Sequence, residues 1–292
     1  MNAINDYKRI CIGCGEWGFR DLPMVQHFKI ARSFGFQFLE FGIGGGRVGR
    51  LSEAPNAEEV GEFIRLGKEY EIATPFCCLE NDFTLTDRLG HRAMVEKVLK
   101  QMVIAKACMA SHVRLFAGFT PLSAMTEPLW KQLLDALFEC QSMASKLGLQ
   151  IAIETHGAIE HSADGSAVHS PTVTTDRIAL ERLLQQMPQE IGINYDPGNI
   201  KAAEGVSSRL HLDLLNSRIN YCHLKDWHRQ GEGWVACGVG DDDLHYGKLL
   251  RDMCFDGVYL IEYEPLHDTE DGIRRSLASL ENSGLSIEFG RA

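Results

Sequence analysis

Short apolar runs alternate with longer segments of helical periodicity along the whole chain. The apolar, β-branched runs typical of buried strands lie at 9–14, 36–41, 71–77, 112–117, 149–155, 191–196, 219–225 and 258–263. Between them, apolar residues recur at three- and four-residue spacing, most clearly over 57–70, 91–109, 127–147 and 174–187. This alternation predicts eight strand–helix units, and therefore a parallel sheet covered by helices.

Boundary residues support these units. The segments 126–128 (Thr-Glu-Pro) and 174–176 (Thr-Thr-Asp) are typical helix starts, and Gly35, Gly148 and Gly257 stand before strands, where a helix-ending glycine belongs. No linker or shift in composition divides the chain, so we expect a single domain over residues 1–292. Eight units favour a closed (β/α)8 TIM barrel. A doubly wound nucleotide-binding sheet is the weaker alternative, because the glycine-rich turn at 42–46 lacks G-x-G-x-x-G spacing.

Four of the apolar runs in the second half end in a side chain that can bind a metal ion. These side chains are Glu154, Asp196, His223 and Glu262. Charged groups at the ends of buried strands are costly unless they are paired or bound to a cation, and the carboxyl ends of barrel strands converge on one site. Three carboxylates and one imidazole suit Mn²⁺ or Mg²⁺, with Co²⁺ and Zn²⁺ also able to occupy the site.

Composition narrows the classes of function. The 292 residues are 45% hydrophobic and 24% charged, as in ordinary globular proteins, and 29 basic against 40 acidic residues give a net charge of −11. That balance argues against nucleic acid as a partner. No apolar stretch reaches the ~20 residues of a membrane span, and the first residues lack a signal-peptide core, which predicts no membrane association and a cytoplasmic location.

Nine cysteines, among them Cys11 and Cys14 in a C-x-x-C, leave zinc binding or redox chemistry open. The count is odd, several cysteines lie in apolar runs, and no second pair follows at zinc-finger spacing. We expect buried, reduced thiols.

The sequence around the four strand ends resembles the xylose isomerase-like superfamily of sugar phosphate isomerases and epimerases. The similar segments are 153–156 (Ile-Glu-Thr-His), 194–199 (Asn-Tyr-Asp-Pro-Gly-Asn), 223–226 (His-Leu-Lys-Asp), 238–244 (Gly-Val-Gly-Asp-Asp-Asp-Leu) and 261–264 (Ile-Glu-Tyr-Glu). The resemblance extends over roughly residues 9 to 283. It implies a TIM barrel whose metal is held by Glu154, Asp196, His223 and Glu262.

The resemblance also implies a chemistry. A divalent ion would polarise a substrate carbonyl and stabilise an enediolate, while Glu154 and Glu262 would act as acid and base on opposite faces of the substrate. Return of the proton to the other face gives epimerisation, return to the neighbouring carbon gives isomerisation, and loss of a β-hydroxyl gives dehydration. We therefore expect a sugar isomerase or epimerase of carbohydrate metabolism.

Three further residues are candidates for substrate binding. Lys225 shares the inward parity of His223 and could polarise a substrate oxygen or form a structural ion pair. His156 follows Glu154 at the same parity and could orient the substrate or support a ligand. Glu40, which ends the second strand, could bind a substrate hydroxyl or hold an arginine.

The sequence departs from the superfamily pattern at Asn199, where many members have histidine. This places an additional ligand or second metal in doubt and weakens the reading as a DNA-repair nuclease. Glu264 shares the parity of Glu262, which we prefer as the ligand because Glu264 lies nearer the loop.

Other segments allow two interpretations. The long loop 157–173 could cover the site or be a solvated surface loop. Arg47 and Arg50 could receive a phosphate or carboxylate, although a salt-bridged surface pair is favoured. Trp17 and Phe116 could form an apolar wall against a sugar or belong to the core.

The sequence thus predicts a metal-dependent isomerase or epimerase of a small sugar, keto-sugar or polyol. The runner-up is a dehydratase of an inosose- or shikimate-like compound, and a non-catalytic barrel with structural ligands is a further alternative. The expected partner is a small sugar-like molecule. A homo-oligomer is compatible with the sequence, which does not fix the oligomeric state.

Overall fold

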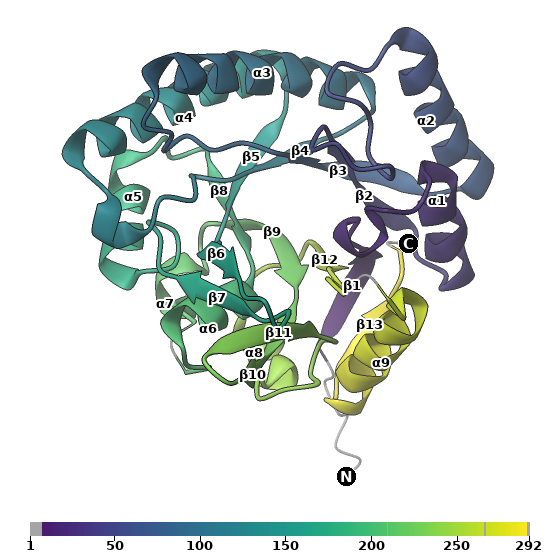
Figure 1. Cartoon of the computed structure of the whole chain (residues 1–292). Coiled ribbons are helices and arrows are strands. Elements are labelled where there is room, and N and C mark those ends of the chain that lie inside the picture. The colour runs from purple at the N-terminus through teal and green to yellow at the C-terminus, as the bar shows by residue number, and fades with distance from the viewer. Residues whose placement is uncertain (1–7, 209, 266, 291–292) are drawn as a thin grey trace.

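Eight parallel strands close into a ring in the computed structural model, which describes residues 8–208, 210–265 and 267–290. The ring follows chain order and closes where β12 pairs with β1 (Figure 1). Its strands are β1 (Arg9–Cys14), β2 (Phe38–Ile43), β3 (Ala73–Leu79), β4 (His112–Leu115), β5 (Gln150–Glu154), β8 (Gly192–Tyr195), β9 (Ile219–Leu224) and β12 (Val258–Ile261).

Helices lie outside this ring, and at least one follows each barrel strand (Figure 1). They are α1 (Met24–Ser33), α2 (Ala57–Tyr70), α3 (Arg88–Ala107), α4 (Glu127–Leu147), α5 (Arg177–Gln186), α6 (Pro197–Glu204), α7 (Leu212–Leu215), α8 (Tyr246–Asp252) and α9 (Thr269–Asn282). The fold is therefore a (β/α)8 TIM barrel, as predicted. Among the described residues, no helix is long and apolar enough to cross a membrane.

The predicted helix boundaries are confirmed except at Gly257: Asp176 caps the start of α5, and Gly35, with a φ of 83°, follows the end of α1. The Thr126 side chain caps α4 by accepting from the Leu129 N–H, and Gly148 ends that helix with a φ of 62°. Gly257 does not end a helix, because α8 stops at Asp252 and an irregular segment follows. A Cβ at Gly257 would lie 2.2 Å from the Phe255 ring, so the glycine makes room for that side chain.

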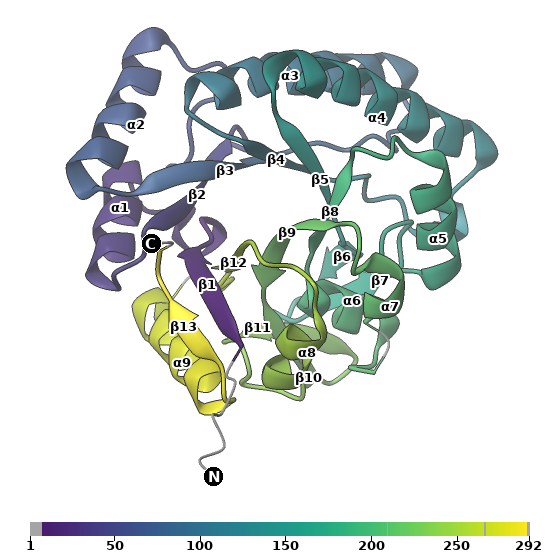
Figure 2. The ribbon, with the colours of Figure 1, turned by 180° about the vertical axis from the view of Figure 1, so that it is seen from behind.

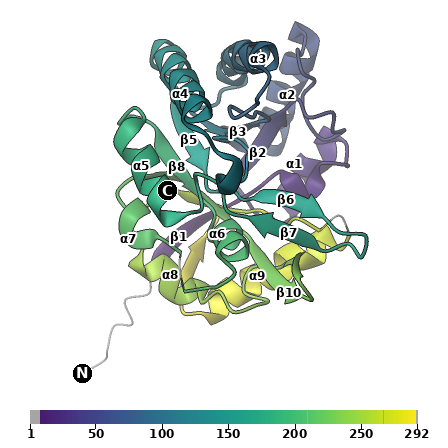
Figure 3. The same ribbon diagram turned by 60° about the vertical axis from the view of Figure 1, so that its left-hand side comes forward.

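The long segment 157–173 lies over the site, one of the two alternatives considered from the sequence, but it is built from strands. It contains a hairpin of β6 (Ala158–His161) and β7 (Ala167–Ser170), and β7 pairs with a second hairpin of β10 (Asp226–Gln230) and β11 (Gly233–Cys237). The four strands form a small antiparallel sheet, order β10-β11-β7-β6. Because the hairpins follow β5 and β9, this sheet stands at the carboxyl ends of the barrel strands, where β6, β7 and β10 project together in Figure 3.

The opposite end of the barrel carries a short added strand. In β13 (Ser286–Glu288), residues pair with the first three residues of β1, and Figure 2 shows the two side by side. Inside the ring, side chains from β1, β3, β5, β9 and β12 form an apolar cluster: Cys11, Phe76, Ala152, Tyr221, Val258 and Leu260. Apolar side chains thus fill the interior away from the carboxyl ends of the strands, and those ends remain available for a site.

Burial of the cysteines is as expected for most of them. Seven of the nine are buried, Cys237 is half-buried and Cys254 is exposed. The two cysteines of the C-x-x-C, Cys11 and Cys14, lie within β1, and burial raises the pKa of the Cys14 thiol. These surroundings do not suit a zinc ligand or a redox thiol.

Candidate functional site

The apolar cluster inside the barrel, which we call the plug, is followed toward the carboxyl ends of the strands by polar side chains. Side chains on a strand alternate between its two faces, so every second residue points inward. In β9, Tyr221 points into the barrel and belongs to the plug, so His223 and then Lys225 follow it on the inner side. In β5 the same order is Ala152, Glu154, so both strands change from apolar to polar inner residues toward their carboxyl ends. The chemistry of the site is therefore set by the last inward positions of each strand.

The four predicted metal ligands meet at this level. Each of Glu154, Asp196, His223 and Glu262 offers one ligand atom, and these atoms lie within 4.8 Å of one another. His223 Nδ1 is 3.7 Å from a Glu154 oxygen and 3.6 Å from a Glu262 oxygen. All four residues are at most 4% exposed, so their mutual repulsion is poorly screened by water. We call these residues the tetrad.

Electrostatics in the tetrad fit a cation. Asp196 Oδ1 accepts the Asn199 N–H, but the buried Oδ2 has no hydrogen-bond partner among the described residues, and the Lys225 ammonium is 3.8 Å away. Burial, reinforced by Glu154 and Glu262, raises the pKa of Asp196 to about 8. Three carboxylates with one imidazole are a donor set for a divalent ion. Such an ion would offset both the cost of burying these carboxylates and their mutual repulsion.

Glu40 orients His223 by contacting the ring nitrogen that faces away from the tetrad. Its Oε1 lies 2.7 Å from His223 Nε2 and accepts from the Tyr221 hydroxyl at 2.5 Å, and its Oε2 accepts the Glu16 N–H. Burial opposes ionisation of Glu40, but His223 outweighs it and lowers the carboxyl pKa to about 2. With Nε2 held by a carboxylate, His223 presents Nδ1 to the tetrad, an arrangement common for metal-binding histidines.

Asn199 holds two tetrad members in place. Its side-chain amide donates to Glu154 Oε1 at 3.2 Å, and its backbone N–H donates to Asp196 Oδ1 at 3.0 Å. At the start of α6, this residue therefore connects two carboxylates to a helix N-terminus. The local structure gives Asn199 a positioning contact in the place where a histidine ligand was considered.

A cavity of about 200 Å³ opens beside the tetrad. It is smaller than the roughly 300–1,000 Å³ of sites for drug-sized ligands, and so suits a small molecule. Its lining residues are Trp17, Glu80, Arg114, Phe116, Phe119, Glu154, His156, Ile159, His161, Lys225, Glu262 and Glu264. Ile159 and His161 come from β6, so the small sheet forms part of the wall.

Two of the three predicted substrate-binding residues line this cavity. The imidazole of His156 packs edge-on against Phe116 and Phe119, its Nδ1 lies 2.6 Å from the Gly157 carbonyl, and burial lowers its pKa. The Lys225 ammonium lies 2.5 Å from Glu262 and 2.9 Å from Glu264. The third, Glu40, is absent from the lining and fully buried.

Glu262 and Glu264 occupy different places, although they share parity on one strand. Glu262 belongs to the tetrad, whereas Glu264 pairs with Lys225 at the cavity wall. Trp17 and Phe116 both line the cavity, as considered from the sequence.

Sequence reasoning missed a buried ion network on the other side of the cavity. Arg50 bridges Glu16 at 2.6 Å and Glu80 at 2.8 Å, and Arg114 lies 3.7 Å from Glu80 and 3.0 Å from Glu154. Glu80 directly follows β3, the same strand-end signal that identified the tetrad. Arg114 is a charged residue inside an apolar run, a signal that could have been read.

Of the two arginines considered as anion receptors, Arg50 is fully engaged in this network and Arg47 forms an exposed pair with Asp21 at 3.3 Å. Gly42 allows the Arg50 contact, because a Cβ there would lie 2.0 Å from Arg50 Nε. The glycine-rich turn thus makes room for a buried arginine.

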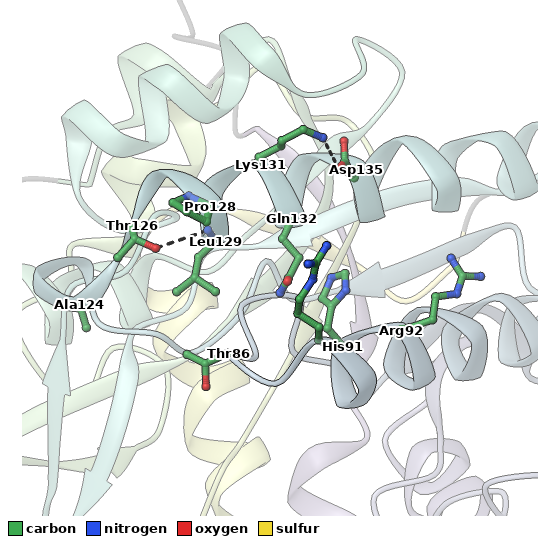
Figure 4. Close-up of a pocket in the computed structure, with 11 residues that line it drawn as sticks. Thr86, His91, Arg92, Ala124, Thr126, Pro128, Leu129, Lys131, Gln132 and Asp135 are labelled. Atoms are coloured by element: carbon green, nitrogen blue, oxygen red, sulfur yellow. Dashed lines mark hydrogen bonds and ion pairs between the residues drawn. The ribbon is translucent and has the colours of Figure 1, made fainter.

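A larger cavity, of about 800 Å³, lies outside the barrel between the first turns of α3 and α4 (Figure 4). Its charged lining residues Arg92 and Lys131 pair with Glu139 and Asp135, and the tetrad does not contribute to it. The smaller cavity is the candidate site, because it lies beside the buried tetrad and two of the tetrad carboxylates line it.

Comparison with known proteins agrees with this architecture. A family model described as xylose isomerase-like TIM barrel matches residues 28–283. A search of curated protein sequences found no match.

Among solved structures, similar folds include D-allulose 3-epimerase from Methylomonas sp., at 16% identity and a TM-score of 0.71, covering 94% of this chain and 98% of that chain. The probable 3-DHS dehydratase AsbF from Bacillus anthracis has 15% identity and a TM-score of 0.72, covering 94% and 99%. The IOLI protein with a bound zinc atom has 15% identity and a TM-score of 0.72, covering 94% and 98%. At these identities the similarity concerns the fold.

Proposed function

The chain belongs to the xylose isomerase-like TIM barrel family, and within it we propose a divalent-metal-dependent isomerase or epimerase of a small sugar, keto-sugar or polyol. The observation that carries the proposal is the tetrad, in which three carboxylates and an imidazole converge beside a small cavity. When bound, Mn²⁺ or Mg²⁺, with Co²⁺ or Zn²⁺ as alternatives, would supply a Lewis acid for a substrate carbonyl.

Glu154 and Glu262 are the proposed acid and base. Both line the cavity, and they come from β5 and β12, which are separated in the barrel by β8 and β9. The two carboxylates therefore approach the cavity from different strands, which supports proton removal on one face of a substrate and delivery on the other. Arg114 and Asn199 hold Glu154, and Lys225 holds Glu262.

The remaining residues act by contact and orientation. We assign His156 and Lys225 to substrate oxygens, because both line the cavity next to the proton-transferring carboxylates. Glu40 is proposed to position His223 rather than to touch substrate, since both of its oxygens already have protein partners.

Exchange of substrate hydrogen with solvent tests this function. The protein, loaded with Mn²⁺, is incubated in D₂O with keto-sugars and polyol-derived ketones, and NMR follows deuterium at each carbon after removal of the metal. We expect incorporation at one carbon next to the carbonyl, with a rate that falls about 10²- to 10⁴-fold in Glu154→Gln and in Glu262→Gln. The exposed variant Glu127→Gln is the matched control. Absence of exchange across the panel would contradict the proposal.

Dehydration is the second candidate, favoured by the similar fold of a probable dehydratase. It begins with the same proton removal but ends with loss of a β-hydroxyl. An α,β-unsaturated or deoxy-keto product in the NMR spectrum identifies it, whereas isomerisation and epimerisation conserve all substrate oxygens.

A further inference from the structure

We infer that the substrate of this cavity is an uncharged polyhydroxy ketone, without a phosphate or carboxylate group. The inference rests on the proposed function and deepens it, because it selects among sugars, sugar phosphates and ring acids. It is carried by the pairing of the cavity's cations, by its excess of carboxylate acceptors and by its aromatic wall.

Each permanently charged cation in the described lining already has carboxylate partners. The Arg114 side chain is 4% exposed and lies 3.0 Å from Glu154 and 3.7 Å from Glu80, and its Nη1 donates to the Leu79 carbonyl. The Lys225 side chain is 5% exposed and lies between Glu262 and Glu264. An anionic substrate would have to take one of these cations from a buried carboxylate, which would then lack compensation.

The lining carries more negative than positive charge. Four carboxylates (Glu80, Glu154, Glu262 and Glu264) face two cations (Arg114 and Lys225), a formal balance of −2. Asp196 stands directly behind and makes it −3, so the two charges of a divalent ion would still leave −1. Two further arginines lie close to lining residues but are not part of the lining. Arg50 is fully buried between Glu16 and Glu80, and the Arg20 guanidinium donates to the backbone carbonyls of Trp17 and Glu264.

The hydrogen-bonding capacity of the lining also favours an uncharged polyhydroxy substrate. Ionised carboxylates only accept hydrogen bonds, and substrate hydroxyls both donate and accept, whereas phosphate dianions and carboxylates only accept. Glu80 and Glu264, which are outside the tetrad, have partly accessible side chains at 27% and 18% exposure. They can therefore receive substrate hydroxyls without competing with a metal ion.

The apolar part of the wall fits the remaining surface of such a molecule. Trp17, Phe116, Phe119 and Ile159 line the same cavity, and they offer contact to the C–H groups of a sugar or cyclitol. Together with the volume of about 200 Å³, this combination favours one small hydroxylated ketone and leaves little room for a phosphate ester.

Matched compounds test the inference by binding, independently of turnover. Calorimetry with the Mg²⁺-loaded protein compares ketohexoses with their 6-phosphates, and an uncharged inosose with dehydroshikimate. We expect an uncharged member to bind and the anionic counterparts to bind about 100-fold more weakly, the size of one like-charge contact near 6 Å in a partly buried site. Anionic members that bind as tightly as their counterparts, or no binding by any uncharged member, would overturn the inference.

Two variants examine the electrostatic cause. Glu80→Gln and Glu264→Gln each remove one carboxylate from the wall, so the preference for uncharged compounds should shrink about tenfold or more in each. Glu127→Gln makes the same change at an exposed site that pairs with Arg182, and should leave the ratio unchanged. Because the ratio is measured within one protein sample, partial misfolding of a variant does not imitate the effect. An unchanged ratio in both wall variants would overturn the inference.

The outcome separates this inference from the proposed function. Tight binding of uncharged ketones without deuterium exchange would contradict the function alone. Exchange confined to phosphorylated or carboxylated compounds would contradict the substrate class and leave the isomerase chemistry in place.

Discussion

Glu16 and Glu80, in the half of the barrel formed by β1 to β4, share the buried Arg50 at 2.6 and 2.8 Å, whereas for Asp196, in the half formed by β5, β8, β9 and β12, the ion-pair partner among the described residues is Lys225 at 3.8 Å. Both halves bury carboxylates next to strand ends. In the first half, arginines from the β2–α2 loop and from β4 compensate them. In the second half, three carboxylates and an imidazole share chiefly Lys225 and Arg114.

This difference teaches that a carboxylate at a strand end does not by itself identify a metal ligand. Glu80 and Glu262 hold similar positions, and what separates them is the partner: a guanidinium beside Glu80 and other ligand-type groups beside Glu262. A self-compensated half stabilises the fold on its own. In the other half, we propose that a bound divalent ion completes the balance.

The largest predicted effect tests the self-compensated half. Arg50→Met leaves Glu16, whose side chain is 1% exposed, without its cation, and we expect the free energy of unfolding to fall by about 3–5 kcal/mol. Urea denaturation measures it. Arg47→Met is the matched control from the same loop, because its pair with Asp21 is exposed and should contribute only about 0–1 kcal/mol. Equal losses in the two variants would mean that burial does not distinguish these arginines.

Glu40 connects the two halves and gives the next effect. Glu40→Gln replaces the carboxylate that holds His223 Nε2, so metal affinity should fall about 10- to 100-fold, as for other residues that orient metal-binding histidines. Calorimetric titration with Mn²⁺ measures the change. Tyr221→Phe removes one hydrogen bond to the same oxygen but keeps the charge, and should have a smaller effect. A larger effect of Tyr221→Phe would argue against the orienting role.

The sequence was sufficient to predict the barrel and the tetrad, because both depend on local patterns. Alternating apolar runs predict the strands, and a ligand-type residue at the end of a run is visible without knowledge of its neighbours. Its partner is not visible. Arg50 reaches Glu16 only because the loop folds back over Gly42, and Glu40 meets His223 across 183 positions of sequence.

The small sheet over the site was missed for a similar reason. Each hairpin is local, but the pairing of Trp234 in β11 with Ala167 in β7 joins loops from two different barrel strands. Nothing in either loop specifies the other.

Proton release on metal binding tests the uncompensated half. Burial and the neighbouring Glu154 and Glu262 raise the pKa of Asp196 to about 8, so in the metal-free protein at pH 7 this carboxyl is mostly protonated. Burial opposes protonation of His223, but Glu40 and Glu262 outweigh it and raise the imidazole pKa well above its usual value, so this imidazole is protonated as well. A metal ion must displace both protons. Apparent Mn²⁺ affinity should therefore fall about a hundredfold for each pH unit below 8, with about two protons released at pH 7. Titrations in buffers of different ionisation enthalpy count the protons, and an affinity that stays constant from pH 6 to 8 would contradict this protonation state.

The smallest expected effect has the opposite sign to that of Arg50→Met. The pKa of Asp196 is raised on folding, so its ionisation opposes folding increasingly as pH rises from the unfolded pKa of about 3.9 toward 8. Asn has no such penalty, and its amide oxygen can still accept the Asn199 N–H. The ionisation penalty corresponds to at most about 5 kcal/mol at pH 8, but the variant also loses the attraction between the carboxylate and Lys225 at 3.8 Å. In EDTA at pH 8, Asp196→Asn should therefore increase the free energy of unfolding by a net amount of about 1 kcal/mol, with the gain vanishing near pH 4.

Added Mn²⁺ should stabilise the wild type and leave the Asp196→Asn variant almost unchanged, because the variant lacks one of the four ligands. The sign of the change in the free energy of unfolding then distinguishes the two halves. Removing a partner from the compensated half destabilises the protein under all conditions, whereas removing a ligand from the tetrad stabilises the metal-free protein and weakens only the metal-bound one. If Asp196→Asn instead destabilises the protein in EDTA as strongly as Arg50→Met does, the tetrad is a structural charge network of the same kind as the first half.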